Sequence, residues 1–219
     1  MHFPHAPADL AALACAYLLG AIPFGLLLVR LTKGIDVRSV GSGNIGATNA
    51  MRAGGRGLGL AVFVLDFLKG WTAAKWLAPW IGAAEGSELG VLRVACGVAA
   101  VVGHCFPIYL RFKGGKGVAA ACGAVVALDW VVFLWGGAAW IAVVALTRFV
   151  GLASMGMVAT FLAAAWILRA DERPELAQGA GILLALICYR HRSNISRMLA
   201  GTEPKLFSGS KRKPPGGPQ

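Results

Sequence analysis

Seven apolar stretches, separated by short polar or basic segments, follow one another along the chain of 219 residues. Apolar runs of about 17 to 25 residues are typical of helices that cross a lipid bilayer. The pattern therefore predicts an all-α, polytopic integral membrane protein with seven transmembrane helices, some of them short. The stretches are Leu10–Val29, Leu58–Ala78, Leu89–Leu110, Val118–Leu128, Val131–Leu146, Leu152–Leu168 and Leu176–Tyr189.

Two of these stretches leave the span count open. Val118–Leu128 is too short to cross a bilayer alone, and only Asp129 and Trp130 separate it from the next stretch. The pair predicts either two short helices around Asp129 or a re-entrant hairpin, so five or six spans are alternatives. The first stretch follows a region without Lys or Arg and continues through Pro23, which indicates a retained helix rather than a cleaved signal peptide.

Composition supports a membrane protein and removes other classes. Hydrophobic residues make up 57% of the chain and charged residues only 14%, whereas about 25% charged is usual for soluble domains. The net charge of +11 does not indicate nucleic-acid binding, because the basic residues lie between apolar runs. The five cysteines form no CxxC pair, so neither a zinc site nor a disulfide framework is predicted.

Charge also predicts the orientation. Most of the 21 Lys and Arg residues fall in alternate connecting segments and in the C-terminal tail. The positive-inside rule places these segments in the cytoplasm, with the N-terminus outside and the C-terminus inside. We expect one membrane domain, residues 1–207, followed by a basic and disordered tail, residues 208–219, that can touch anionic lipid.

The first cytoplasmic segment of chemical interest covers residues 41–52, GSGNIGATNAMR. Gly41, Gly43 and Gly46 allow tight turns whose exposed N–H groups can hold an anion. Arg52 adds a fork that suits phosphate. A polar connector that merely caps the next helix is the simpler alternative. Further hydrogen-bonding side chains favour a binding loop: Ser42, Asn44, Thr48 and Asn49.

The second such segment contains Gly114-Gly115-Lys116-Gly117. It lacks the GxxxxGK[ST] spacing of a nucleotide-binding loop. The glycines still let the backbone approach a ligand whose negative charge Lys116 neutralises. Nearby Arg111 and Lys113 fit ordinary flanking charges, and His104 fits either a substrate contact or a packed histidine.

The third segment, residues 191–205, reads HRSNISRMLAGTEPK. On a helix, His191 and Asn194 lie three residues apart on one face. Glu203 is the one carboxylate in this basic region, so it either pairs with a cation or contacts substrate. Arg192 and Arg197 fit headgroup anchors.

Asp66 and Lys69 lie inside the second apolar stretch. Charges at membrane depth are costly and usually face a protein interior or a cavity. Their spacing of three permits a mutual ion pair as well as a role in a site.

Phosphate-seeking groups on three cytoplasmic segments beside lipid indicate chemistry that joins a phosphorylated small molecule to an acyl chain. Acyl transfer requires proton removal from a hydroxyl and stabilisation of an oxyanion. The chain has no GxSxG motif for a serine nucleophile. His191 fits either a base or a binding group. No cluster of metal ligands is seen, so we expect neither a metal nor a cofactor.

These motifs together resemble the bacterial acyl-phosphate-dependent glycerol-3-phosphate acyltransferases, the family called PlsY. The similarity spans nearly the whole chain. It includes, in order, Tyr17–Gly25, Gly41–Arg52, Asp66–Gly70, Gly103–Pro107, Phe112–Val118 and Asn194–Lys205.

The resemblance implies transfer of an acyl group from acyl phosphate to the 1-hydroxyl of sn-glycerol 3-phosphate. It implies a multi-pass protein of the bacterial inner membrane with a site that faces the cytoplasm. Acyl phosphate, glycerol 3-phosphate and membrane lipid are then the partners, with transient contact to the acyl-phosphate-forming enzyme and none to nucleic acid. The implied catalytic residues are Ser42, Arg52, Lys116, His191 and Asn194, and the substrate-binding residues are Gly41, Gly43, Asn44, Thr48, Asn49, His104, Gly114, Gly115 and Glu203.

Two other classes compete with this interpretation. A transporter of small organic phosphates also needs cytoplasmic phosphate ligands, but it favours polar groups through the bilayer midplane and inverted repeats. Asp66 and Lys69 are the one intramembrane pair in the sequence, and no repeat is evident. A purely structural membrane protein leaves the three motif-rich segments unexplained.

Overall fold

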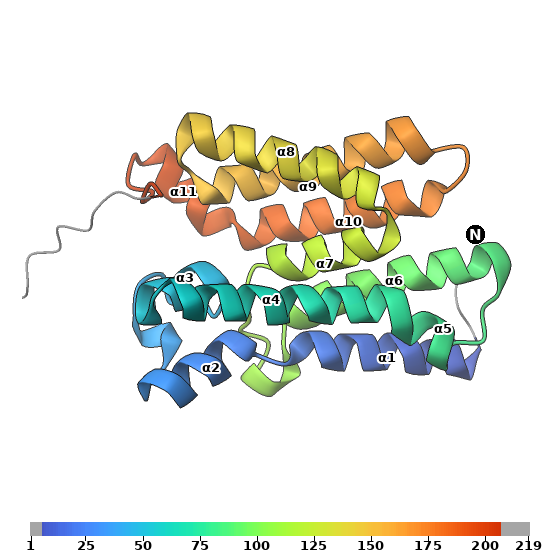
Figure 1. Cartoon of the computed structure of the whole chain (residues 1–219), viewed down its shortest axis with the longest axis horizontal. Helices are drawn as coiled ribbons and strands as arrows, with labels where there is room; N and C mark the ends of the chain where they lie inside the picture. Colours follow the sequence, from blue (N-terminus) through green and yellow to red (C-terminus); the bar gives the residue numbers. More distant parts are fainter. Residues whose placement is uncertain (1–5, 207–219) are drawn as a thin grey trace, which may run out of the picture.

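The computed structural model describes residues 6–206, and these residues form helices without any strand. The predicted tail, residues 208–219, lies outside the described residues. The all-α prediction is confirmed. Seven helices alternate in direction along one axis (Figure 1): α1 (Pro7–Ala21), α4 (Arg56–Thr72), α6 (Gly86–Cys105), α7 (Val118–Leu128), α8 (Trp130–Thr147), α9 (Val150–Arg169) and α10 (Pro174–Arg190).

Shorter helices connect these seven or flank them. They are α2 (Phe24–Lys33), the 3-10 helix η1 (Val37–Ser39), α3 (Ala47–Gly54), the π-helix η2 (Ala73–Leu77), α5 (Ala78–Ile81), the 3-10 helix η3 (Ile108–Leu110) and α11 (Arg192–Leu199). Helices α3 and α11 lie at the same end of the bundle (Figure 1).

Five helical segments among the described residues are long and apolar enough to span a membrane: Pro7–Lys33, Arg56–Ile81, Gly86–Leu110, Trp130–Thr147 and Val150–Arg169. Helix α7 is apolar but has only 11 residues, and α10 has 17. The chain is an integral membrane protein. The count of seven spans and the orientation of the termini stay predictions.

The first apolar stretch differs from the single helix expected for it. It breaks between α1 and α2, at Ile22 and Pro23, where Ile22 has ψ 118°. Proline has no N–H to donate and disfavours helical geometry in the residue before it. The carbonyl oxygen of Ile22 instead accepts a hydrogen bond from Lys69 Nζ at 3.2 Å.

Asp129 separates two helices, α7 and α8. Its Oδ1 accepts the backbone N–H groups of Val131 at 2.9 Å and Val132 at 3.1 Å, so it caps the start of α8. Its Oδ2 accepts from Arg169 Nε on α9 at 2.7 Å. The structure thus shows two helices around a capping Asp129, and whether α7 crosses the membrane or re-enters it stays a prediction.

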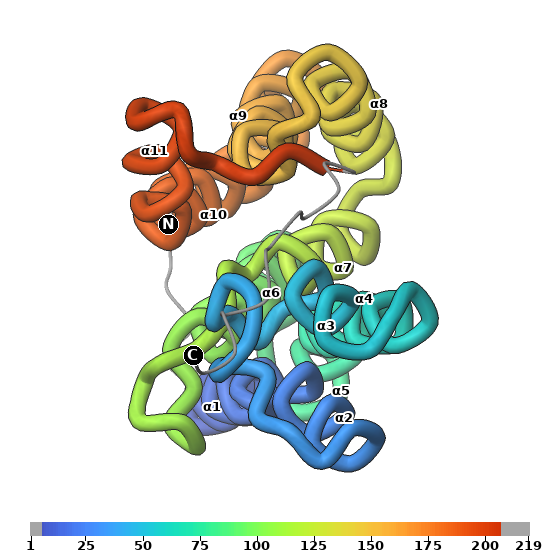
Figure 2. Tube along the Cα trace, turned by 90° about the vertical axis from the view of Figure 1, so that its left-hand side faces the viewer, coloured from blue at the N-terminus to red at the C-terminus, as the bar shows by residue number. Residues whose placement is uncertain are grey.

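The helices form two groups (Figure 2): α1 to α6 on one side and α8 to α11 on the other. Helix α7 packs on α4, and α10 packs on α6, so these contacts join the groups. Glycines let the backbones approach closely, as is common between membrane helices. A Cβ on Gly123 of α7 would lie 1.9 Å from the carbonyl oxygen of Phe67 on α4, and one on Gly20 would lie 2.1 Å from that of Ala100.

The α4–α7 contact yields a stability prediction. Gly123→Ala should lower the free energy of unfolding of the detergent-purified protein by about 1–3 kcal/mol, and with it the unfolding temperature. The added methyl group meets backbone atoms that cannot rotate away. Gly137→Ala is the matched control, since a Cβ at this position in α8 meets no atom within 4 Å. Equal unfolding temperatures for the two variants would contradict the close α4–α7 approach.

Candidate active site

Three polar segments carry the candidate residues, and the first and third lie at the end of the bundle where α3 and α11 lie (Figure 1). The first is the loop before α3, the second connects α6 to α7, and the third runs from the end of α10 to residue 206. Side chains of the third segment contact the second directly, and Arg52 from the first lies within electrostatic reach of Lys116 in the second.

Asn49 shapes the first loop. Its side chain is 1% exposed. The amide Nδ2 donates to the carbonyl oxygens of Val37, Val40 and Asn44 at 2.8, 3.1 and 2.9 Å, and Oδ1 accepts from the Ser42 N–H at 2.9 Å. These bonds occupy the Asn49 side chain within the loop, so it organises the backbone from which exposed Ser42 projects.

The glycines of this loop are needed for its turns. Gly41 and Gly43 have φ values of 57° and 69°, which residues other than glycine rarely adopt. A Cβ on Gly41 would lie 2.2 Å from Asn49 Oδ1 and 3.6 Å from Arg52 Cδ. The loop therefore packs against Asn49 and the exposed Arg52, while Thr48 is half-buried in the first turn of α3.

Arg190 holds the glycine loop that carries Lys116. Its guanidinium donates from Nε to the carbonyl oxygen of Gly115 at 2.9 Å and from a terminal nitrogen to that of Gly114 at 2.7 Å. It also lies over the Phe106 ring, 5.2 Å from the centroid. This fork satisfies two successive backbone carbonyls and fixes the residues directly before Lys116.

A chain of polar contacts joins Lys116 to the C-terminal segment. Lys116 Nζ donates to Asn194 Oδ1, and Asn194 Nδ2 donates to Glu203 Oε1 at 2.6 Å. The other carboxylate oxygen of Glu203 accepts from Arg197 Nε at 2.6 Å. Glu203 thus pairs with a cation, which was one of the two alternatives for it.

His191 lies between α10 and α11 and is 2% exposed. Burial, and after it the positive charge of Lys116, lower the pKa of His191 to about 4. Its Nδ1 lies 2.8 Å from the carbonyl oxygen of Ile187. A carbonyl only accepts, so the neutral ring carries its proton on Nδ1 and leaves Nε2 as an acceptor. Asn194 follows one turn later, its N–H donating to the His191 carbonyl at 2.8 Å.

Positive charge exceeds negative charge around Lys116. Burial lowers the pKa of Lys116 to about 8. This value already includes the charge of Glu203, which raises the pKa, and the charges of Arg197, Arg190 and Arg52, which lower it. Four cations against one carboxylate favour an anion with more than one negative charge.

His104 is buried, whereas Lys116, Arg190 and Arg197 are half-buried and Arg52 is exposed. Its side chain is 4% exposed and packs beneath the glycine loop, where a Cβ on Gly115 would lie 2.0 Å from Nε2. Among residues 6–206, no three His, Cys, Asp or Glu side chains come together as a metal site.

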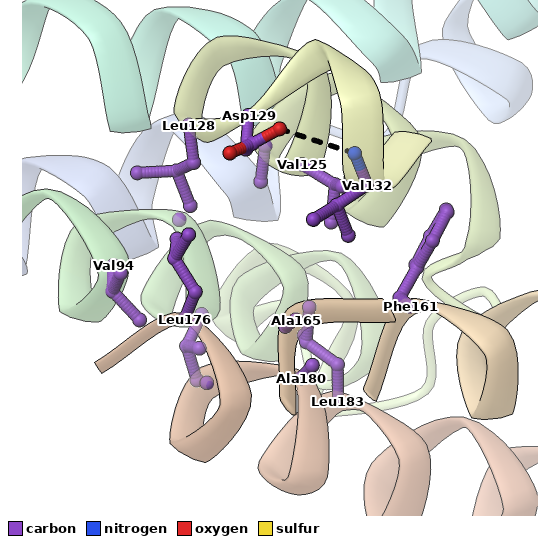
Figure 3. Close-up of a pocket in the computed structure, with 14 residues that line it drawn as sticks. Val94, Val125, Leu128, Asp129, Val132, Phe161, Ala165, Leu176, Ala180 and Leu183 are labelled. Carbon is purple, nitrogen blue, oxygen red and sulfur yellow. Dashed lines mark hydrogen bonds between the residues drawn. The ribbon is translucent and has the colours of Figure 1, made fainter. Parts of the chain in front are cut away.

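A separate pocket lies among α6, α7, α8, α9 and α10 (Figure 3). Apolar side chains line it almost entirely, including Val94, Leu128, Phe161 and Leu183. Asp129 at its edge is already bonded to Val132 and Arg169. Because α7 begins beside Lys116 and ends at Asp129, the pocket edge at Asp129 lies at the far end of α7.

The family follows from comparison with known sequences. A family profile described as glycerol-3-phosphate acyltransferase matches residues 10–201. The chain belongs to this family. It is therefore an integral membrane acyltransferase of phospholipid biosynthesis, and the resemblance inferred from its motifs is confirmed.

Individual glycerol-3-phosphate acyltransferases match along most of their length. The enzyme of Maricaulis maris is 43% identical over 90% of this chain and 87% of its own. That of Rhodospirillum rubrum is 46% identical over 90% and 89%. Two crystal structures of the integral membrane acyltransferase PlsY, in a glycerol 3-phosphate form and a lysophosphatidic acid form, give TM-scores of 0.81 and 0.80. They are 39% and 38% identical and cover 90% of this chain and 95% of theirs.

The sequence interpretation missed two residues at this candidate site. Arg190 was counted among flanking basic residues, and only the structure shows its bonds to Gly114 and Gly115. Gly151 lies in the first turn of α9, where a Cβ would lie 3.1 Å from Asn194 Nδ2. An apolar sequence around Gly151 gave no signal of this contact.

The Arg190 fork gives a prediction for catalysis. Arg190→Ala should raise the KM for glycerol 3-phosphate roughly tenfold or more, since two bonds from a charged donor to the Lys116 loop are lost. Arg192→Ala removes the same charge two residues away, where the guanidinium lies over the Tyr189 ring. Steady-state kinetics of both variants in lipid measure the difference. An equal KM in the two variants would show that the Arg190 hydrogen bonds to the glycine loop do not support substrate binding.

Proposed function

We propose that this membrane acyltransferase moves a fatty acyl group from acyl phosphate to the 1-hydroxyl of sn-glycerol 3-phosphate. The products are 1-acyl-sn-glycerol 3-phosphate (lysophosphatidic acid) and inorganic phosphate. The observation that carries the proposal is the cation-rich chain from Lys116 through Asn194 to Glu203 and Arg197, beside a neutral His191. The glycerol 3-phosphate and lysophosphatidic acid forms of PlsY support the same substrate and product.

The site residues divide by their chemistry. Lys116 and Arg52 hold phosphate groups, because both are cations at the same end of the bundle. Asn194 and His191 position glycerol 3-phosphate through an amide and an accepting ring nitrogen. The N–H groups of Ser42, Gly43 and Gly46 already donate within the loop, so the exposed Ser42 hydroxyl is the donor that we assign to the oxyanion at the reacting carbonyl.

The proton of the attacking hydroxyl passes to a phosphate oxygen in this mechanism. His191, with its pKa lowered to about 4, is a weaker base than a phosphate ester, whose second pKa is about 6. His191 Nε2 accepts a hydrogen bond from the other hydroxyl of glycerol 3-phosphate and orients the molecule, so the attacking hydroxyl directs its proton to the phosphate oxygen. The new C–O bond to the acyl carbon forms as the bond to the phosphate oxygen breaks, and the phosphate leaves with both electrons of that bond.

The site faces the cytoplasm of a bacterial inner membrane in this proposal. The basic connecting segments that carry Arg52 and Lys116 are on the side that the positive-inside rule assigns to the cytoplasm. Acyl phosphate enters from the lipid side with its acyl chain in the membrane, and glycerol 3-phosphate enters from water. The acyl-phosphate-forming enzyme contacts this face transiently.

A donor assay tests the reaction. Purified protein in lipid receives labelled glycerol 3-phosphate with acyl phosphate, acyl-CoA or acyl carrier protein, each alone. We expect labelled lysophosphatidic acid from acyl phosphate only, and a loss of at least a hundredfold in kcat/KM for Lys116→Ala or Arg52→Ala. Product from acyl-CoA or acyl carrier protein without acyl phosphate would overturn the donor assignment. Uptake into vesicles without conversion would favour a transporter.

Activity should fall at alkaline pH because the pKa of Lys116 is lowered to about 8. The ammonium is charged below this pH and neutral above it. The kcat/KM for glycerol 3-phosphate should therefore decline by up to about tenfold per unit above pH 8. Lys116→Arg keeps its charge and should lose this decline, even if its overall rate is lower. The same alkaline decline in both proteins would show that Lys116 is not the titrating group.

A further inference from the structure

Three titratable side chains lie buried beneath the glycine loop. Asp66 and Lys69 come from α4 and His104 from the last turn of α6, and each is at most 4% exposed. Lys69 Nζ lies 2.8 Å from Asp66 Oδ1, and His104 Nδ1 lies 3.5 Å from the same oxygen. Charged groups in membrane segments are costly and are usually kept for a function. The proposed mechanism gives none of the three a contact with substrate.

Mutual neutralisation accounts for only part of this group. Asp66 balances the charge of Lys69, and Lys69 also donates to the Ile22 carbonyl at the break between α1 and α2. An ion pair needs no imidazole. Among the described residues, the buried Nδ1 of His104 makes no hydrogen bond, and Asp66 is its ionic neighbour. The ion pair therefore borders the Nδ1 edge of the His104 ring.

The opposite edge of that ring supports the glycine loop. A Cβ on Gly115 would lie 2.0 Å from His104 Nε2, and one on Gly114 would lie 2.2 Å from the His104 carbonyl oxygen. The Gly115 N–H donates to the same carbonyl at 3.0 Å. His104 thus contacts the loop from below while Arg190 holds its carbonyl oxygens from another helix. Lys116 is the next residue.

We propose that Asp66, Lys69 and His104 are positioning residues for Lys116. Asp66 and Lys69 orient the His104 ring, the ring sets the position of the Gly114–Gly115 backbone, and that backbone aims Lys116 Nζ at Asn194. The inference rests on the proposed function in one respect, that Lys116 holds the phosphate of glycerol 3-phosphate. Loss of the support then weakens phosphate binding in the ground state and the transition state alike, which raises KM more than it lowers kcat.

The decisive variant is Asp66→Leu/Lys69→Met. It removes both charges together, so no charge is left unpaired in the membrane. We expect a folded protein, a roughly tenfold higher Kd and KM for glycerol 3-phosphate, and a kcat within about threefold of the original. His104→Leu is a second variant that removes the ring beneath Gly115 without touching the ion pair, and it should give the same split.

The matched control is Asp129→Asn/Arg169→Met. It neutralises the ion pair at the far end of α7, where the two side chains lie 2.7 Å apart, and Asn still caps α8. Its KM should be unchanged. Unfolding temperatures of all variants are measured first, and assays are run well below the lowest of them. The positioning role would be overturned if KM is unchanged in folded Asp66→Leu/Lys69→Met or in folded His104→Leu. It would also be overturned if KM rises equally in the control.

Equilibrium binding of labelled glycerol 3-phosphate separates this inference from the proposed reaction. If no donor gives product but Asp66→Leu/Lys69→Met still weakens binding relative to the control, the positioning role stands and the acyl phosphate reaction fails. If product forms and binding is unchanged in that variant, the reaction stands and the positioning role fails.

Discussion

The low polarity of the bilayer requires every polar backbone group inside the bundle to find a partner within the chain. The loop between α6 and α7 is the hardest place to meet this requirement, because it is irregular and rich in glycine. Arg190 donates hydrogen bonds to two successive carbonyl oxygens of the loop, and the His104 carbonyl accepts one from the Gly115 N–H, so these loop groups have partners. Without such partners, a polar loop carrying Lys116 could not stay in this position.

The hydrogen bonds that satisfy the polar backbone groups of the loop also fix the position of Lys116. Lys116 follows directly after the held glycines, so its ammonium points at Asn194 instead of sampling solvent. The same low polarity lowers its pKa to about 8 and that of His191 to about 4. Folding therefore leaves a cation that gains from an incoming phosphate, beside an imidazole that can only accept a hydrogen bond through Nε2. Structural satisfaction and substrate binding depend on the same few bonds.

Sequence patterns predicted the parts of this arrangement that are local. The bounds of Val118–Leu128 were reproduced because Gly117, with φ 85°, and the capping Asp129 end the helix on either side. The break at Pro23 was missed because the apolar pattern continues through it. Arg190 was missed because a basic residue at the end of a span is indistinguishable from a flanking charge until its distant partners are known. Asn49 looked like a ligand group, yet its bonds depend on the folded loop.

The distribution of polar groups also argues for an enzyme over a transporter. The pocket among α6 to α10 is apolar, and the carboxylate at its edge, Asp129, is already used by the α8 backbone and Arg169. This pocket thus gives the cations around Lys116 no polar continuation, and the buried Asp66 and Lys69 beneath the glycine loop are paired with each other and with the Ile22 carbonyl. Alternating access needs a site reachable from both faces. A site that binds phosphate at one end, with lipid beside it, instead suits a reaction whose second substrate and product are partly membrane-embedded.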